Sequence, residues 1–396
     1  MADYYQVLVI GGGNAGISLA ARLHRYKVAD IGLIEPRPVH YFQPLFSHIG
    51  GGAARMSEAV RAQAQVMPRE VEWIRGEAAD IRPEENAVLL ADGRRIGYGQ
   101  LVVCPGLQLD WDGVPGLAEA MASPQVTSNY DPAMPEKTWK LVCSLRSGTA
   151  VFTQPPEPAK CAGVAQKIAY LACDYWREQG VLEDIRVVLV VPTPTVFGVK
   201  EVDAALRAKI AEYGIELCTS TTLAGVDAAR RAVALAGPDG TRELTFNLLH
   251  AVPPQSAPDW LKDTPLPAAG DAGGFVEVDP ELLRHRRYGN VWSLGDAAAT
   301  LNYKSGGALR KQVKVLARNL AAVVGGREPR ERYNHYGVCP IALTRHTLLF
   351  AEFDHQYRPM PTFPRLDPAK ERRWAWVLDR WIFPQIYWHL ILKGRA

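Results

Sequence analysis

The segment that most constrains the fold is "YQVLVIGGGNAGISLAARLHRY", residues 5–26. An apolar, β-branched run is followed by a glycine-rich turn and then by an apolar helical pattern. The turn carries a GxGxxG motif, with residues Gly11, Gly13, Asn14, Ala15 and Gly16. Such glycines allow a tight turn and let a pyrophosphate approach the free N–H groups at the start of the helix. The segment therefore predicts a Rossmann-like unit that binds a dinucleotide.

An acidic residue follows at the position that this kind of unit requires. The second predicted strand, "DIGLIEP", ends in Glu35, 19 residues after Gly16 (35 − 16 = 19). A carboxylate there accepts hydrogen bonds from the ribose hydroxyls of an adenosine. The order of strand, loop, helix, strand and acid is more specific than a GxGxxG motif alone.

Two later segments favour FAD over NAD as the dinucleotide. "LVVCPGLQ", residues 101–108, is a short buried strand that ends in a turn at Gly106. "NVWSLGDAA", residues 290–298, is a strand that brings Gly295 and Asp296 to the start of a helix. A second α/β pattern lies between them, which indicates an α/β fold with two Rossmann-like domains, one inserted into the other. We expect a split FAD-binding domain at 1–112 and 266–325, a second domain at 113–265 and a C-terminal region at 326–396.

The second domain has an unusual loop after its own buried strand. In "VVLVVPTPTVFGVK", residues 187–200, Pro192 and Pro194 stand where a nicotinamide-binding domain carries glycines. Proline has no N–H to donate, and Val196 and Phe197 add bulk where a pyrophosphate would lie. The loop predicts a degenerate NAD site, so that the electrons must come from another reductant.

Composition excludes several classes of protein. A net charge of +3 over 396 residues does not indicate a nucleic-acid partner. The six cysteines have neither CxxC nor Cys/His metal spacing, which argues against structural zinc, and none precedes Cys104, which excludes a CxxxxC disulfide reductase. The first strand begins so early that we expect no signal peptide. No run of 18 uncharged apolar residues occurs, so we expect no simple transmembrane helix.

Several motifs resemble those of the sulfide:quinone oxidoreductase family, and most closely its mitochondrial-type branch. They are "HYFQPLFSHIGGG" (40–52), "SNYDPAMPEKTWKLV" (128–142), "KCAGVAQKIAYL" (160–171), "VFGVK" (196–200), "LHAVPPQSAPD" (249–259), "HRRYGNVWSLGD" (285–296), "YGVCP" (336–340) and "LLFAEFD" (348–354). They cover nearly the whole chain in unbroken order. The resemblance implies that sulfide is the electron donor, FAD the carrier and a membrane quinone the acceptor.

The resemblance also implies the redox residues. Cys161 and Cys339 would form a disulfide, and hydrosulfide would attack Cys339 to leave a persulfide there. The released Cys161 thiolate would pass two electrons to the flavin, with Lys160 and Lys167 lowering its pKa. The other four cysteines are interpreted as small buried hydrophobic residues. Because no third cysteine lies near the N-terminus, we expect sulfane sulfur to pass to a small acceptor such as a thiol or sulfite.

Three further residues are assigned by resemblance. Lys304, in "NYKSGGALRKQ", would lie near the pyrimidine edge of the flavin, although a surface lysine is the alternative. Gln43, in "YFQP", would contact the flavin. Phe353, in "LLFAEFD", would stack on the quinone ring, on the side opposite the cysteines.

The C-terminal tail "KERRWAWVLDRWIFPQIYWHLILKGRA", residues 370–396, holds four of the ten tryptophans. Trp and Tyr beside basic residues are typical of segments that lie at a membrane surface, and Pro384 breaks the apolar run. We expect an amphipathic, monotopic membrane-binding tail whose removal leaves FAD uptake intact. Core-packing or dimer-forming helices are the alternative.

Two other functions remain open at this point. A type II NADH:quinone dehydrogenase shares the expected fold, FAD and tail, but the loop at 187–200 and the paired cysteine motifs oppose it. A non-catalytic flavin-bound membrane protein would not need either cysteine.

Overall fold

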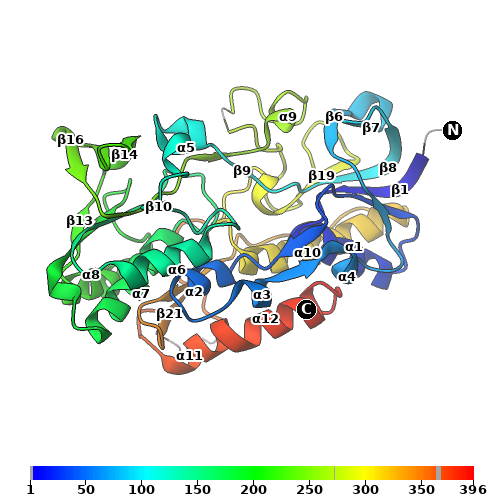
Figure 1. The fold of residues 1–396 in the computed structure, drawn as a ribbon. Coiled ribbons are helices and arrows are strands. Elements are labelled where there is room, and N and C mark those ends of the chain that lie inside the picture. Colours follow the sequence, from blue (N-terminus) through cyan, green and yellow to red (C-terminus); the bar gives the residue numbers. More distant parts are fainter. Residues whose placement is uncertain (1–2, 272, 363–366) are drawn as a thin grey trace.

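The computed structural model describes residues 3–271, 273–362 and 367–396, and the predicted domain ranges include the positions outside this description. Figure 1 shows two α/β units side by side, with the last helix running beneath them. The first unit is built on a seven-stranded sheet of order β5-β2-β1-β8-β7-β6, with β19 beside β8. Its strands are β1 (Asp3–Ile10), β2 (Ile31–Ile34), β5 (Glu72–Ile74), β6 (Ala78–Arg82), β7 (Ala87–Leu90), β8 (Arg95–Val103) and β19 (Val291–Ser293).

The centre of this sheet is parallel and covered on both faces. β1 pairs in parallel with β2 and β8, and β19 pairs in parallel with β8. Residues 7–10 are all buried, which is why the strand reads as a continuous apolar run instead of an alternating one. Helices α1 (Asn14–Arg25) and α10 (Gly306–Val324) pack against each other beside the sheet.

The second unit has a five-stranded parallel sheet of order β10-β17-β11-β12-β13. Its strands are β10 (Val126–Thr127), β11 (Gly148–Thr153), β12 (Ile185–Val190), β13 (Glu216–Cys218) and β17 (Leu248–His250), and its helices are α6 (Pro135–Ser144), α7 (Val164–Glu178) and α8 (Lys200–Glu212). An antiparallel sheet of β14 (Thr222–Asp227), β15 (Ala232–Gly237) and β16 (Gly240–Thr245) lies at its end. The predicted pair of Rossmann-like units, one inserted into the other, is confirmed.

The two chain segments that join the units pair with each other. β9 (Gln108–Leu109) and β18 (Gln255–Ser256) form a short antiparallel ladder. Further short elements are β3 (Val39–Tyr41), β4 (Val60–Ala62), α2 (Leu45–Gly50), α3 (Met56–Ala59), α4 (Gln63–Val66), α5 (Leu117–Ala120) and α9 (Asp259–Lys262).

A C-terminal hairpin lies between the two units. β20 (Gly337–Ala342) pairs with β21 (Leu348–Phe353), so that Cys339 lies opposite Ala351 and Gly337 opposite Phe353. Alternate side chains of a strand point to opposite faces of the sheet. Cys339 and Phe353 accordingly pack with the core of the second unit, whereas Val338 packs with that of the first.

The tail forms one helical run, made of α11 (Arg373–Val377), a π-helical stretch (Leu378–Ile382), α12 (Phe383–Ile386) and a second π-helical stretch (Tyr387–Ile391). Pro384, which interrupts the apolar run of the sequence, does not end this helical run. Pro384 lies at the start of α12, and the π-helical geometry on either side accommodates its missing N–H.

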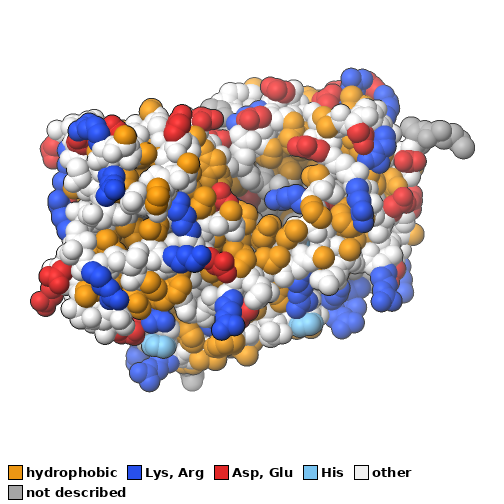
Figure 2. Space-filling view, viewed as in Figure 1, with side chains coloured by type: hydrophobic (Ala, Val, Ile, Leu, Met, Phe, Trp, Pro, Cys, Tyr) orange, Lys and Arg blue, Asp and Glu red, His pale blue; other side chains and the backbone are white. Residues whose placement is uncertain are grey.

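The tail is buried on one side and exposed on the other. Its buried side includes Ala375, Pro384, Tyr387, Trp388 and Leu392. Its exposed apolar side chains, called the apolar strip below, are Trp374, Val377, Trp381, Ile382 and Leu390. Figure 2 shows apolar side chains along the lower edge of the molecule, with Lys and Arg beside them. Over the residues that the structure describes, none of the helices combines the length and apolar character needed to span a bilayer.

Candidate active site

The glycine loop between β1 and α1 is closely packed at Gly11, Gly12 and Gly16 and open at Gly13. Gly11 has φ +105°, and a Cβ there would lie 2.4 Å from the carbonyl oxygen of Cys104. A Cβ on Gly16 would lie 1.9 Å from the carbonyl oxygen of Gly11. A Cβ on Gly13 would meet nothing within 4 Å. The helix that follows has no side-chain cap, so its first N–H groups face an open space that fits a pyrophosphate.

Glu35 follows β2 and holds the loop from the other side. Its Oε2 accepts a hydrogen bond from the N–H of Gly12 at 2.7 Å, and its Oε1 accepts one from the N–H of Arg37 at 2.8 Å. Gln63 donates to the carbonyl of Gly12 at 2.8 Å. A carboxylate has about four acceptor positions, so Glu35 retains capacity for a ribose. Sequence reasoning missed Arg37, which bonds to Glu35 two residues away, and Gln63, whose partner Gly12 lies in another segment.

His40 is a further residue that sequence reasoning missed. Its Nδ1 lies 3.2 Å from the carbonyl oxygen of Gly12, and its Nε2 lies 2.5 Å from the hydroxyl of Tyr387 in the tail. Burial lowers the pKa of His40 to about 4, so the ring is neutral at physiological pH. Nδ1–H then donates to Gly12, and Nε2 accepts from Tyr387. The tail therefore contacts the glycine loop through His40, while the expectation that FAD uptake does not need the tail stays a prediction.

The other residues assigned to the cofactor lie near the carboxyl ends of neighbouring strands. Gly106 (φ +85°) follows β8 and Gly295 (φ +72°) follows β19. The N–H of Gly295 donates to Gln312 at 2.9 Å. A Cβ on Gly106 would meet nothing within 4 Å, so this glycine borders open space. Because β8 and β19 pair in register, Gly106 and Asp296 belong to the same edge of the sheet.

Lys304 is buried, which rules out the surface-lysine alternative. Its Nζ donates to the carbonyls of Asp296 and Ala298, each at 2.8 Å. Burial lowers the pKa of Lys304 to about 8, and the charge of Asp296 opposes this shift. An ammonium has three N–H donors, so one remains for a ligand.

Gln43 connects the first unit to the cysteine segment of the second. Its Oε1 accepts a hydrogen bond from Nζ of Lys160 at 2.7 Å. Burial lowers the pKa of Lys160, and the nearby charge of Asp296 opposes the shift. Residues from both units thus converge beside Cys161.

The two predicted redox cysteines come from segments that the fold brings together. Cys161 lies just before α7, with φ +44°, and its N–H donates to the carbonyl of Lys304 at 2.9 Å. Cys339 lies in β20 and is buried. A Cβ on Gly163 would lie 3.5 Å from Sγ of Cys339. Tyr303 accepts a hydrogen bond from the N–H of Gly163 at 3.0 Å, and its hydroxyl lies 3.6 Å from Sγ of Cys339.

Both cysteines are free thiols here, and burial dominates their ionisation. It raises the pKa of Cys161 to about 12, while Lys167 and then Lys160 lower it. It also raises the pKa of Cys339, which Lys167 again lowers. The predicted effect of the two lysines has the right direction, but desolvation outweighs it in this state.

The remaining cysteines do not all fit the buried interpretation. Cys104 and Cys173 are buried, as expected. Cys143 and Cys218 are only partly buried, which corrects the expectation for these two. Cys218 lies at the end of an edge strand and accepts a hydrogen bond from Arg242 at 2.8 Å.

The loop after β12 is filled by its own chain. Oδ1 of Asp203, in the first turn of α8, accepts hydrogen bonds from the N–H groups of Val196 at 2.7 Å and Phe197 at 3.1 Å. The side chains of Val196 and Phe197 are buried, and the Phe197 ring lies 5.4 Å from that of Phe353. Two backbone donors of this loop are therefore already used.

Phe353 lies on the same face of the hairpin as Cys339. Its ring contacts those of Phe197, Tyr303 and Tyr357. The assignment of Phe353 to the quinone stays a prediction. Phe350, an odd number of residues away, points to the other face, and its ring lies 6.1 Å from Phe383 of the tail.

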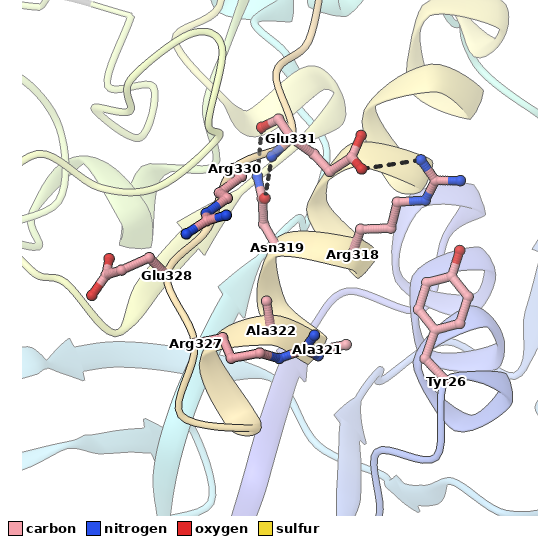
Figure 3. Close-up of a pocket in the computed structure, with 9 residues that line it drawn as sticks. All are labelled: Tyr26, Arg318, Asn319, Ala321, Ala322, Arg327, Glu328, Arg330 and Glu331. Carbon is pink, nitrogen blue, oxygen red and sulfur yellow. Dashed lines mark hydrogen bonds and ion pairs between the residues drawn. The ribbon is translucent and has the colours of Figure 1, made fainter.

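Two surface pockets lie away from the cysteines. A pocket of about 640 Å³ lies between the ends of α1 and α10 and the segment 327–331 (Figure 3). Arg318 pairs with Glu331 at 3.2 Å and Asn319 bonds to its backbone, so these contacts fasten the segment to α10. A second pocket, of about 470 Å³, borders the apolar strip and is lined by Gly52, Ala53, Ala54, Arg55, Ser57, Glu58, Arg380 and Trp381.

Comparison with known proteins identifies relatives over the whole chain. The model of the family described as pyridine nucleotide-disulphide oxidoreductase matches residues 5–315. A mitochondrial sulfide:quinone oxidoreductase of Mus musculus is 35% identical over 396 residues, which cover 99% of this chain and 87% of the mouse protein. The structure of the sulfide:quinone oxidoreductase from Aquifex aeolicus superposes with a TM-score of 0.84 at 21% identity, covering 100% of this chain and 92% of that one.

A more distant structure shares the fold alone. NDH2 from Plasmodium falciparum, solved in complex with NADH, superposes with a TM-score of 0.66 at 10% identity, covering 100% of this chain and 99% of that one.

Proposed function

The chain belongs to the sulfide:quinone oxidoreductase family, and on that basis we propose that Cys161 and Cys339 are its redox-active pair. It is a FAD-dependent enzyme that oxidises sulfide and delivers the electrons to a quinone. The observation that carries the cysteine assignment is the convergence of the two segments at Gly163 and Tyr303. The resemblance noted from the motifs is confirmed.

Residues around the open glycine loop are proposed to hold the cofactor. The N–H groups at the start of α1 bind its pyrophosphate and Glu35 its adenosine ribose, while Lys304, Gln43 and the residues after β8 and β19 border the flavin. FAD, when bound, supplies a two-electron acceptor that passes the electrons on to the quinone.

The cysteines perform the sulfur chemistry in this proposal. Hydrosulfide attacks Sγ of Cys339 in a disulfide with Cys161, the S–S bond breaks, and Cys161 leaves as a thiolate while Cys339 carries the new sulfur atom. Lys167, whose charge lowers the pKa of both thiols, stabilises the leaving thiolate. The persulfide then transfers its outer sulfur to a small nucleophile such as a thiol or sulfite.

Substitution of each cysteine tests this assignment. Cys161→Ser and Cys339→Ser should retain FAD but lose sulfide-dependent reduction of both flavin and quinone. Cys143→Ser is the control, since Cys143 is partly exposed and a hydroxyl is tolerated there. Sulfide turnover near that of the unmodified enzyme in either redox variant would contradict the assignment and favour a non-catalytic role for the cysteines.

We further propose that the apolar strip of the tail rests on a membrane surface and that the quinone enters beside it. Among the described residues, five of the nine exposed large apolar side chains belong to this one helical run. Such a strip, flanked by basic residues, suits the headgroup region of a bilayer. Arg380 anchors the run to the first unit through Glu58, at 2.8 and 2.9 Å.

Liposome flotation at high salt tests the membrane proposal, since apolar burial persists when charge attraction is screened. Trp374→Ser with Trp381→Ser should reduce flotation and should slow turnover with a long-tailed quinone more than turnover with a short, water-soluble one. Leu301→Ser is the control, because Leu301 is more exposed than either tryptophan but lies outside the tail. If the unmodified protein fails to float, the strip is a protein-binding surface instead.

A further inference from the structure

Tyr303 links the two cysteine segments. It lies just before α10, next to Lys304, whose carbonyl accepts the N–H of Cys161. The Tyr303 ring packs edge-on against Phe353, with centroids 5.6 Å apart. Its hydroxyl reaches both the backbone of Gly163 and Sγ of Cys339. The steps proposed for the two cysteines give this side chain no role.

The surrounding hydrogen bonds fix the direction in which the hydroxyl donates. The N–H of Gly163 can only donate, so the phenolic oxygen is the acceptor of that 3.0 Å bond. The phenolic proton is then free to point toward Sγ of Cys339, 3.6 Å away. Burial raises the pKa of Tyr303 well above its ordinary value, so the hydroxyl keeps its proton throughout the physiological range.

We propose that Tyr303 is a catalytic hydrogen-bond donor to Sγ of Cys339, which stabilises the thiolate that leaves when the bound sulfane sulfur is transferred. This inference rests on the proposed function and adds a residue to it. In the transfer step a nucleophile forms a bond to the outer sulfur of the Cys339 persulfide. The S–S bond breaks, its electron pair remains on Sγ of Cys339, and a thiolate results. Charge therefore develops on the atom that Tyr303 faces.

Other groups that face Cys339 do not duplicate this contact. Lys167 on α7 lowers the pKa of Cys339 through its charge, and Asp379 in the tail raises it. The thiol of Cys161 and the phenols of Tyr130 and Tyr357 also interact electrostatically with this region. Tyr130 donates its hydrogen bond to the carbonyl oxygen of Cys161, at 2.8 Å. Tyr130→Phe thus provides a matched control that removes a nearby hydroxyl without affecting the sulfur of Cys339.

The first test is a titration that needs no turnover. In the Cys161→Ser holoenzyme, the ultraviolet absorbance of the Cys339 thiolate is followed against pH, with Cys161→Ser/Cys339→Ser as the blank. Adding Tyr303→Phe, which keeps the ring against Phe353, should raise the pKa of Cys339 by about one unit, since a hydrogen bond to an ionised group is lost. Adding Tyr130→Phe should leave it unchanged. An unchanged pKa in the Tyr303→Phe variant would overturn the inference.

The second test follows sulfur release. Enzyme loaded with one equivalent of sulfide is mixed anaerobically with cyanide, and thiocyanate formation is timed; cyanide plus persulfide gives thiocyanate plus the Cys339 thiolate. Tyr303→Phe should slow this release about tenfold, the equivalent of about one pKa unit in the leaving thiol. Release as fast as in the unmodified enzyme would overturn the inference. If the unmodified enzyme yields no thiocyanate, the persulfide of the proposed function fails, while the titration still decides the role of Tyr303.

Discussion

The two Rossmann-like units each have a loop between a buried strand and a helix, and the two loops are built in opposite ways. The loop at 11–16 packs its glycines against backbone at Gly11 and Gly16 and leaves space at Gly13. The loop at 192–198 buries Val196 and Phe197 and uses their N–H groups to bind Asp203. The same strand–loop–helix frame therefore binds an acidic side chain of its own in the second unit, whereas in the first unit we propose that it binds an anionic cofactor.

The difference concerns the electron donor. The Plasmodium protein, which shares the fold, was solved in complex with NADH. In this chain Val196 and Phe197 fill the loop of the second unit, and the cysteine segment lies at the start of α7 in the same unit. We propose that the filled loop keeps a nicotinamide dinucleotide from approaching.

The largest effect should come from a methyl group in the open loop. Gly11→Ala places a Cβ 2.4 Å from the Cys104 carbonyl at a φ of +105°, so the loop must move. We expect the free energy of FAD binding to weaken by at least about 3 kcal/mol, which corresponds to a loss of about 100-fold or more in affinity. We expect purified protein without bound flavin, as measured by the ratio of flavin to protein absorbance. Flavin content equal to that of the unmodified enzyme would show that this loop does not bind the cofactor.

Lowering the pH should weaken the first loop. The folded-state pKa of His40 is about 4 against 6.5 in the unfolded chain, so between these values the unfolded chain binds more protons. The contribution of neutral His40 to the free energy of unfolding is fully present above pH 6.5. It is lost as the pH falls toward 4, by up to about 3 kcal/mol. FAD release should accelerate over this window.

His250 requires a control in that measurement. It lies in the second unit, and burial also lowers its pKa to about 4, so that it destabilises the protein over the same pH range. His40→Gln retains hydrogen-bonding groups at position 40 but does not titrate. The difference in FAD release between this variant and the unmodified enzyme isolates His40, and equal pH dependence of the two would contradict the assignment.

The contrast between the loops also shows how much of the structure could be predicted from the sequence. Strand, glycines and Glu35 are adjacent or nearly so in the chain, and their pattern predicts the first unit, which is confirmed. The cysteine pair was found only by resemblance, because no local pattern brings Cys161 and Cys339 together. His40 was missed for the same reason, since its partner Tyr387 lies in the tail.

Two other features have a local signal in the sequence. Phe350 and Phe353 lie an odd number of residues apart in one strand, so only one of them can share the face of Cys339. Three residues after the tail's exposed Trp381, Pro384 interrupts the apolar run. It does not end the helix, because the π-helical geometry on either side accommodates its missing N–H.

Asp203→Ala should lower the stability of the protein moderately and should not let NADH replace sulfide as the electron donor. It removes an acceptor that satisfies two N–H groups of the buried loop, which costs about 1–3 kcal/mol. Thermal unfolding should occur at a lower temperature, whereas Asp203→Asn, which keeps an acceptor oxygen, should lose less. Millimolar NADH should still fail to bleach the flavin anaerobically, because Val196 and Phe197 remain buried in the loop. Rapid bleaching would mean that Asp203 alone closes the nicotinamide route.

The smallest effect should come from the contact that joins the tail to the open loop. Tyr387→Phe removes the hydrogen bond to His40 but keeps the ring packed against Phe42, with centroids 4.3 Å apart. The change reaches the loop only through His40. We therefore expect FAD binding to weaken by about half the net free energy of one hydrogen bond, which gives about a threefold faster release of FAD.

A control separates this specific contact from tail docking in general. Glu58→Gln weakens the ion pair with Arg380, which fastens the tail at a different point. It should loosen the tail, as judged by hydrogen exchange, and leave FAD release unchanged. If both variants release FAD equally fast, the tail supports the loop by covering it as a whole. If only Tyr387→Phe speeds FAD release, the hydrogen bonds from Tyr387 to His40 and from His40 to Gly12 transmit the effect. The helix that we propose to lie on the membrane would then be coupled to the affinity for FAD.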